Sequence, residues 1–106
     1  MSNKEYQVIV SQRAAEMMVS HAGFLAGISP EAAERLIDAF QKAVGSLSQM
    51  PHRGKYLTGE FIPPNKYRQL VIGKRYLLIY QIVNDTVYID YVVDGRQDYG
   101  WLLFEP

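Results

Sequence analysis

The sequence contains no cysteine, which excludes disulfide bonds and metal sites built on thiolates. It has only two histidines, His21 and His52, and two imidazoles alone do not complete a zinc site. No apolar run approaches the roughly 20 residues of a membrane span, and the first five residues lack the apolar stretch of a signal peptide. We therefore expect a cytoplasmic protein with no metal, no cofactor and no membrane segment.

Net charge is also absent, because eleven Lys and Arg residues balance eleven Asp and Glu residues. A neutral total argues against strong non-specific binding to nucleic acid, which needs an uncompensated positive surface. The charge is nevertheless uneven, since residues 51–80 hold six basic side chains and one acidic one. This segment predicts either a patch that binds phosphate or an acidic target, or merely a solvated loop and strand edge. The candidates for target or phosphate binding are Arg53, Lys55, Arg68, Lys74 and Arg75, with Arg96 further along the chain.

The first half of the sequence predicts one strand and two helices. Residues 6–10 alternate with period two, as a short strand does. Ser11 then begins a helix as its N-cap, and residues 26–28 interrupt it. A second start follows, with Ser29 as N-cap and Pro30 in the first helical position. Its apolar stripe continues until the Met50–Pro51 step, so the two helices should form an antiparallel hairpin.

The second half predicts a loop followed by a β-meander. Residues 51–66 contain two glycines and three prolines and are expected to be irregular. Strands are expected at 67–72, 75–83 and 86–93, joined by turns at 73–74 and 84–85. Both faces of the strand at 75–83 are apolar, so the C-terminal segment 101–104 or a partner chain should cover the second face. The chain therefore predicts a single α+β domain, residues 1–106, with one mainly antiparallel sheet and both helices on one face.

Several phrases of the sequence resemble toxins of the RelE/ParE superfamily, in matching order along nearly the whole chain. They comprise residues 11–16 at the first helix, Met50-Pro51-His52-Arg53-Gly54 after the second, residues 66–71, residues 76–82, and Val92-Val93-Asp94-Gly95-Arg96-Gln97-Asp98. The resemblance implies the toxin of a type II toxin–antitoxin system, of the plasmid stabilisation kind, that inhibits growth until a cognate antitoxin binds it. The superfamily includes poisons of DNA gyrase and ribosome-dependent mRNA interferases.

Two positions decide between those activities. RNA cleavage without metal needs a base, an acid and cations that stabilise the charged phosphorane. Relatives that cleave mRNA usually keep an arginine where this chain has Leu77. They place a second arginine, or a histidine–tyrosine pair, near what is here residues 95–99, and alignment on Gly95 puts Gln97 at the position of that arginine. Both departures, together with the neutral net charge, favour a ParE-like protein that binds and inhibits a target such as gyrase. The alternatives are a metal-free endoribonuclease acting with the ribosome, and a degenerate member that is not toxic.

The residue hypotheses each have a structural counterpart. If the chain is an enzyme, the catalytic candidates are Arg68, Arg96, Tyr99 and His52; the candidates for antitoxin contact are Tyr76, Tyr80, Trp101 and Phe104. Arg68 could instead pair with Asp90, and Arg96 with Asp98. The tyrosines could simply pack across the strands, and Trp101 could anchor the C-terminal segment on the sheet. His21 lies on the apolar stripe of its helix and is expected to be a core residue.

Overall fold

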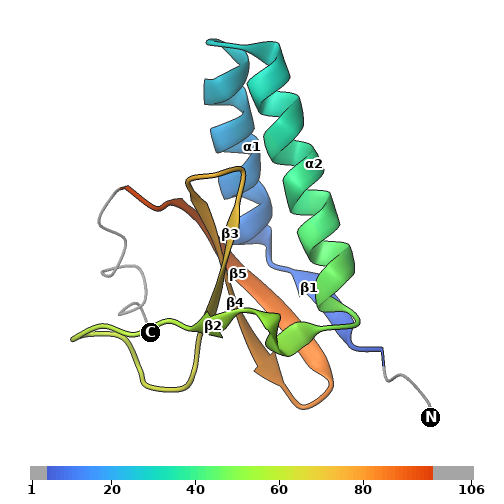
Figure 1. Ribbon diagram of the computed structural model, residues 1–106, viewed down its shortest axis with the longest axis vertical. Coiled ribbons are helices and arrows are strands. Elements are labelled where there is room, and N and C mark those ends of the chain that lie inside the picture. The colour runs from blue at the N-terminus through green and yellow to red at the C-terminus, as the bar shows by residue number, and fades with distance from the viewer. Residues whose placement is uncertain (1–4, 97–106) are drawn as a thin grey trace.

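A helical hairpin packs against one face of a five-stranded sheet in the computed structural model, which describes residues 5–96 (Figure 1). The elements in chain order are β1 (Gln7–Val10), α1 (Gln12–Ala26), α2 (Pro30–Leu47), the 3-10 turn η1 (Pro51–Arg53), β2 (Lys55–Tyr56), β3 (Arg68–Ile72), β4 (Tyr76–Val83) and β5 (Thr86–Asp94). The sheet order is β1-β5-β4-β3-β2. The predicted α+β class, the helical hairpin and the three-stranded meander are confirmed.

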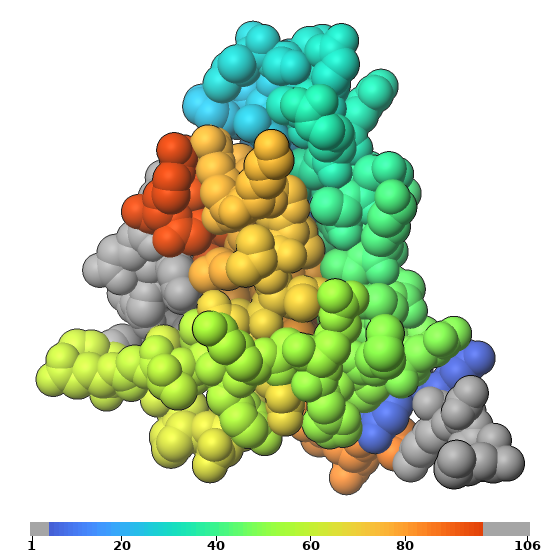
Figure 2. Space-filling model, in the orientation of Figure 1, coloured from blue at the N-terminus to red at the C-terminus, as the bar shows by residue number. Residues whose placement is uncertain are grey.

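Both helices begin where their capping residues predict. The Ser11 hydroxyl accepts a hydrogen bond from the Ala14 N–H at 3.0 Å, and the Ser29 hydroxyl accepts one from the Ala32 N–H at 3.3 Å. Each bond pairs one of the four N–H groups that the first turn of a helix leaves without an intrahelical partner. The hairpin that results extends beyond the β3–β4 turn, so its tip projects past that end of the sheet (Figures 1 and 2).

The sheet is mixed because its N-terminal strand joins an otherwise antiparallel set. β3, β4 and β5 form the meander, and β1 runs parallel to β5, with Gln7 opposite Thr86. The predicted turn at residues 84–85 has a left-handed backbone at Asn84, with φ +56°. The β3–β4 turn has φ values of +57° at Gly73 and +77° at Lys74, and it also takes in Arg75, which the sequence had placed in the strand.

The main core lies between the helical hairpin and the sheet. It contains apolar side chains from α1, α2 and the three long strands, namely Ala14, Met18, Leu36, Ala43, Leu47, Ile72, Tyr76, Leu78, Tyr80, Val87, Ile89 and Val92. The residues of β4 that face the helices alternate along the strand: Tyr76, Leu78, Tyr80 and Ile82. Burial of this face provides most of the driving force for folding, because it removes the largest apolar area from water.

Part of the second face of the sheet is covered by residues 57–67, which the sequence had marked as loop except for Tyr67, where a strand was expected to begin. Leu57, Ile62 and Tyr67 pack against Ile79, together with Tyr91 and other residues of β4 and β5. The expected cover, residues 101–104, lies outside the described residues. Residues 51–66 were expected to be irregular, which was wrong in two short stretches, the 3-10 turn η1 and the strand β2. A strand of two residues is too short to show the alternation by which strands are predicted.

Candidate functional site

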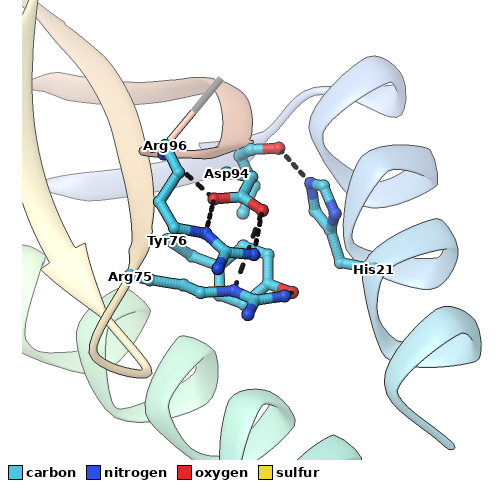
Figure 3. A network of polar contacts seen from close by, with 6 residues as sticks. His21, Arg75, Tyr76, Asp94 and Arg96 are labelled. Atoms are coloured by element: carbon cyan, nitrogen blue, oxygen red, sulfur yellow. Dashed lines mark hydrogen bonds and ion pairs between the residues drawn. The ribbon is translucent and has the colours of Figure 1, made fainter. Parts of the chain in front are cut away.

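Two arginines meet one aspartate at the end of the sheet beneath the hairpin tip (Figure 3). Asp94 is the last residue of β5, Arg75 lies in the β3–β4 turn, and Arg96 follows β5 by two residues. The Asp94 carboxylate accepts the Arg96 backbone N–H at 3.0 Å and lies 3.4 Å from the Arg96 guanidinium. The Arg75 Nε lies 3.7 Å from the same carboxylate. One buried carboxylate therefore compensates part of the charge of two candidate cations.

The hydrogen bonds of this group keep Asp94 ionised. The backbone N–H of Arg96 lowers the pKa of Asp94, burial opposes it, and the charges of Arg96 and Arg75 lower it further. Arg75 is less well satisfied, because its buried Nε has no hydrogen-bond acceptor among the described residues. A contact of 3.7 Å is too long for a hydrogen bond, so Asp94 supplies charge but no acceptor to that nitrogen.

A cavity of about 300 Å³ opens beside these charges. Its lining comes from α1 and from the strand ends: Ser20, His21, Phe24, Arg75, Tyr76, Asp94 and Arg96. The His21 Nε2 lies 2.8 Å from the Val92 carbonyl oxygen, and its ring stacks at a tilt on Tyr76, with centroids 4.9 Å apart. Phe24 is 63% exposed, so the cavity has a polar floor and an exposed aromatic rim.

A second cavity, of about 270 Å³, continues from the first. Its lining is mostly apolar and joins the hairpin tip to the β3–β4 turn: Leu25, Ala32, Arg35, Leu36, Gly73, Lys74, Arg75 and Tyr76. Arg75 and Tyr76 line both cavities, so the two are neighbours across one pair of side chains. We call them together the hairpin cleft. Residues of the hairpin form one wall of this cleft, and residues at the strand ends form the other.

Two other candidate cations, Arg53 and Arg68, lie near the opposite end of the sheet and form hydrogen bonds that hold the connection between α2 and β2. The Arg68 guanidinium donates to the Gly54 carbonyl at 2.6 Å and lies 4.1 Å above the Tyr56 ring. Arg53 donates to the Ser46 hydroxyl at 2.7 Å. The alternative in which Arg68 pairs with Asp90 was wrong, because the Asp90 carboxylate instead accepts from Gln81. These contacts give Arg68 and Arg53 structural roles.

Tyr80 completes this connection from inside the core. Its hydroxyl donates to the Pro51 carbonyl at 2.7 Å and accepts the Gly54 N–H at 3.0 Å. Gly54 has no room for a side chain, since a Cβ would lie 2.6 Å from the Gln69 carbonyl oxygen and from the Tyr80 hydroxyl oxygen. The Met50–Gly54 phrase is therefore explained by packing as well as by resemblance.

The other predicted residues fall in three places. Tyr80 is fully buried, so the surface role proposed for it does not fit the fold, whereas Tyr76 is buried in the core and also lines the hairpin cleft. His52 and Lys55 are exposed, with the His52 ring 6.2 Å from the Tyr6 ring, and Lys74 is exposed at the cleft. The predictions for Tyr99, Trp101 and Phe104 concern positions outside the described residues, as does the pairing of Arg96 with Asp98.

Sequence reasoning missed three residues of the cleft, Asp94, Phe24 and His21. Asp94 had been named only within residues 92–98, which resemble the toxin superfamily. Its position at the end of a predicted strand was the one feature of the sequence that could have indicated a functional residue. His21 had been expected to be a core residue because it lies on the apolar stripe of its helix, and its hydrogen bond to the Val92 carbonyl fits that expectation. Its ring nevertheless also borders the cleft. Across residues 5–96, no three side chains of the metal-binding types gather as they would around a metal ion.

One family model matches most of this chain. The model of the ParE toxin of the type II toxin–antitoxin system, parDE, matches residues 8–99. A solved structure titled as the chromosomal ParDE toxin–antitoxin system from P. aeruginosa is similar in fold, with a TM-score of 0.67 and 17% identity. The match covers 88% of this chain and 98% of that one. No curated protein matches significantly. Within the described part of the chain, neither helix is long and apolar enough to cross a membrane.

Proposed function

This chain belongs to the ParE toxin family of type II toxin–antitoxin systems, and we propose that it arrests growth by binding DNA gyrase rather than by cleaving RNA. Family membership makes it the toxin component and implies an antitoxin as its partner. The choice of gyrase follows the resemblance to ParE-type toxins described above. The choice of binding over cleavage follows from the ion pairs that Arg75 and Arg96 form with Asp94 in the hairpin cleft.

The contact of Arg75 and Arg96 with Asp94 is the observation that carries this proposal. A phosphorane carries more negative charge than the phosphodiester from which it forms, so a nuclease gains most from cations that lack a fixed counter-ion. Here two of the three arginines that line the cleft, Arg75 and Arg96, already share a buried carboxylate. Such a group suits recognition of a protein surface, where paired charges set orientation and selectivity.

His52, the histidine named among the catalytic candidates, does not change this conclusion. His52 is exposed, and its partners are the Tyr6 ring and, through its carbonyl, Arg68. Leu77 stands at the position where mRNA-cleaving relatives usually keep an arginine. It packs against the hydrophobic cluster on the second face of the sheet, around Ile79. The cluster gives that position an apolar role, and a cation there would need a polar partner.

Controlled expression in a bacterial host tests the proposal. We expect growth arrest with gyrase–DNA breaks that can be trapped and counted, and no new mRNA 5′ ends on translating ribosomes. Arg96→Ala should relieve the arrest while the protein stays folded, because Arg96 lies at the surface beyond β5. Lys42→Ala is the matched control, since it removes one exposed positive charge from α2, away from the cleft, and should leave arrest unchanged.

RNA cleavage remains the second candidate because one observation favours it. The His21 imidazole borders the same cavity as Arg75 and Arg96, and a base beside two cations is the arrangement that metal-free cleavage needs. New mRNA ends that disappear with His21→Gln, in cells without gyrase–DNA breaks, would establish this activity and exclude the gyrase proposal. Normal growth on induction would instead identify a degenerate, non-toxic member.

A further inference from the structure

We propose that the cavity between the hairpin tip and the β3–β4 turn binds a small phosphomonoester whose organic part is a flat ring, as in a nucleoside monophosphate. We call this cavity, of about 270 Å³, the turn cavity. The inference goes beyond the proposed function and does not depend on gyrase being the target, because it concerns a ligand that the purified chain binds alone. The charged rim, an unpaired donor and an aliphatic floor lead to it.

The charged side chains that line the turn cavity are all positive. They are Arg35 on α2, and Lys74 and Arg75 in the β3–β4 turn; no carboxylate of residues 5–96 lines it. Arg35 and Lys74 form no ion pair within the described part of the chain, although Glu31, one helical turn before Arg35, offsets part of its charge. Three cations around a partly enclosed space attract an anion more strongly than they do in open water.

Arg75 carries a donor that the fold leaves unpaired. Its buried Nε has no acceptor among the described residues, and the Asp94 carboxylate lies 3.7 Å away, in the adjoining cavity. The Arg75 guanidinium also lies over the Tyr76 ring, 5.2 Å from its centroid, and donates to the Tyr76 hydroxyl at 3.2 Å (Figure 3). A buried charged donor without an acceptor is costly, so an oxygen atom of a ligand would contribute more here than an exposed ion pair does.

The number and type of these cations favour a phosphate over a carboxylate. A phosphomonoester carries a charge of about −1.5 to −2 at neutral pH and presents three strong acceptor oxygens. A carboxylate presents a single charge on two oxygens. Arg35 and Arg75 supply planar guanidinium groups, which pair with phosphate oxygens through two parallel N–H donors, and Lys74 adds a compact point charge.

The floor of the turn cavity is aliphatic. Leu36 is buried, Leu25 and Ala32 are half-buried, and the Tyr76 ring lies beside them, whereas Lys74 at the rim is exposed. A volume of about 270 Å³ corresponds to roughly nine water molecules of about 30 Å³ each, which is enough for one ring system with its phosphate at the rim. Because water gains little beside aliphatic walls, a flat ring is stabilised by displacing it.

Titration calorimetry with the purified full-length chain tests the inference. The probes are adenosine monophosphate, guanosine monophosphate and phenyl phosphate, while inorganic phosphate and adenosine report the two halves of the ligand separately. We expect at least one of the three phosphomonoesters to bind with a Kd below about 1 mM at low ionic strength. Inorganic phosphate and adenosine should each bind at least about tenfold more weakly, because each makes only one of the two sets of contacts.

Two substitutions at the rim test the contribution of charge. Arg35→Gln and Lys74→Gln should each weaken binding of that phosphomonoester at least about fivefold, because each removes a charge-assisted hydrogen bond. Lys42→Gln on the same helix and Lys55→Gln on β2 are the matched controls, since both lysines are exposed and lie outside the turn cavity. Each control should change the affinity less than about twofold.

A substitution at the floor tests the place of the ring. Ala32→Leu fills part of the turn cavity without adding charge, and leucine suits a helix, so the fold should be kept. We expect this variant to bind the phosphomonoester at least about fivefold more weakly and inorganic phosphate unchanged, a split that loss of folding would not produce. Circular dichroism melting curves check that all the variants are folded.

Three outcomes would overturn the inference. One is failure of all three phosphomonoesters to bind, and another is binding that neither rim substitution weakens. The third uses an unphosphorylated single-stranded oligonucleotide: if the rim variants lower its affinity but leave that of the phosphomonoesters unchanged, the turn cavity belongs to a nucleic-acid surface. None of these measurements involves gyrase or growth, so each proposal can fail while the other stands.

Discussion

Removal of the Tyr80 hydroxyl should destabilise the protein far more than the loss of one oxygen atom suggests. The hydroxyl donates to the Pro51 carbonyl and accepts the Gly54 N–H, both in buried surroundings. Tyr80→Phe keeps the ring and its packing, so the change isolates these two hydrogen bonds. It also leaves two backbone groups inside the protein without partners, and water has little access to replace them.

The expected magnitude follows from those two contacts. A buried hydrogen bond contributes about 1 kcal/mol net, and an orphaned buried group costs about 1–3 kcal/mol, so we expect a loss of roughly 2–4 kcal/mol. For a chain of this size that corresponds to a fall in melting temperature of roughly 8–16 °C. Urea unfolding monitored by circular dichroism measures the free energy of unfolding directly, and the slope of the transition should stay constant.

A neighbouring tyrosine supplies the control. The Tyr76 hydroxyl accepts only a part-buried bond of 3.2 Å from the adjacent Arg75, so Tyr76→Phe should cost less than about 1 kcal/mol. Both variants lose the same atom from the same strand and the same face of the sheet. Equal free energies of unfolding for the two variants would refute the claim that the hydrogen bonds of Tyr80 stabilise the connection between α2 and β2.

Three further predictions concern the same connection and the cleft. Gly54→Ala should cost at least about 2 kcal/mol in urea unfolding, because the new Cβ would lie 2.6 Å from the Gln69 carbonyl oxygen. Acid titration should show stability falling as the pH drops through the lowered folded pKa of Asp94, since that carboxylate stabilises the fold above its ordinary pKa; Asp94→Asn should remove this part of the acid transition. At alkaline pH, burial raises the pKa of Tyr80, with the Gly54 hydrogen bond opposing it. Stability should therefore be complete below the ordinary tyrosine pKa and fall as the pH rises toward the folded value, and Tyr80→Phe should flatten that decline.

Local signals in the sequence were sufficient for the helices and the meander. Ser11 and Ser29 cap helices because the bond from a serine hydroxyl to a nearby N–H involves residues only three apart. Asn84 marks a turn because its side chain tolerates positive φ. Such features are decided by neighbours along the chain, so a single sequence reveals them.

Features decided by distant residues were not accessible in the same way. Nothing in the period of residues 7–10 indicates that β1 runs parallel to β5. Nothing in the composition of residues 51–67 indicates that Leu57 and Tyr67 pack against Ile79. The cleft shows the same limit. Arg75 and Arg96 could be proposed from their charge, whereas their shared contact with Asp94 depends on how two strand ends meet.

The central claim, that this toxin disables gyrase by binding, is tested most directly with purified components. A supercoiling reaction containing gyrase, relaxed plasmid and ATP, without ribosomes or RNA, is titrated with the protein. We expect supercoiling to be inhibited in proportion to added protein, with Arg96→Ala inactive and Lys42→Ala as effective as the parent. Full supercoiling at saturating protein, together with mRNA cleavage in a parallel reaction on translating ribosomes, would contradict the account.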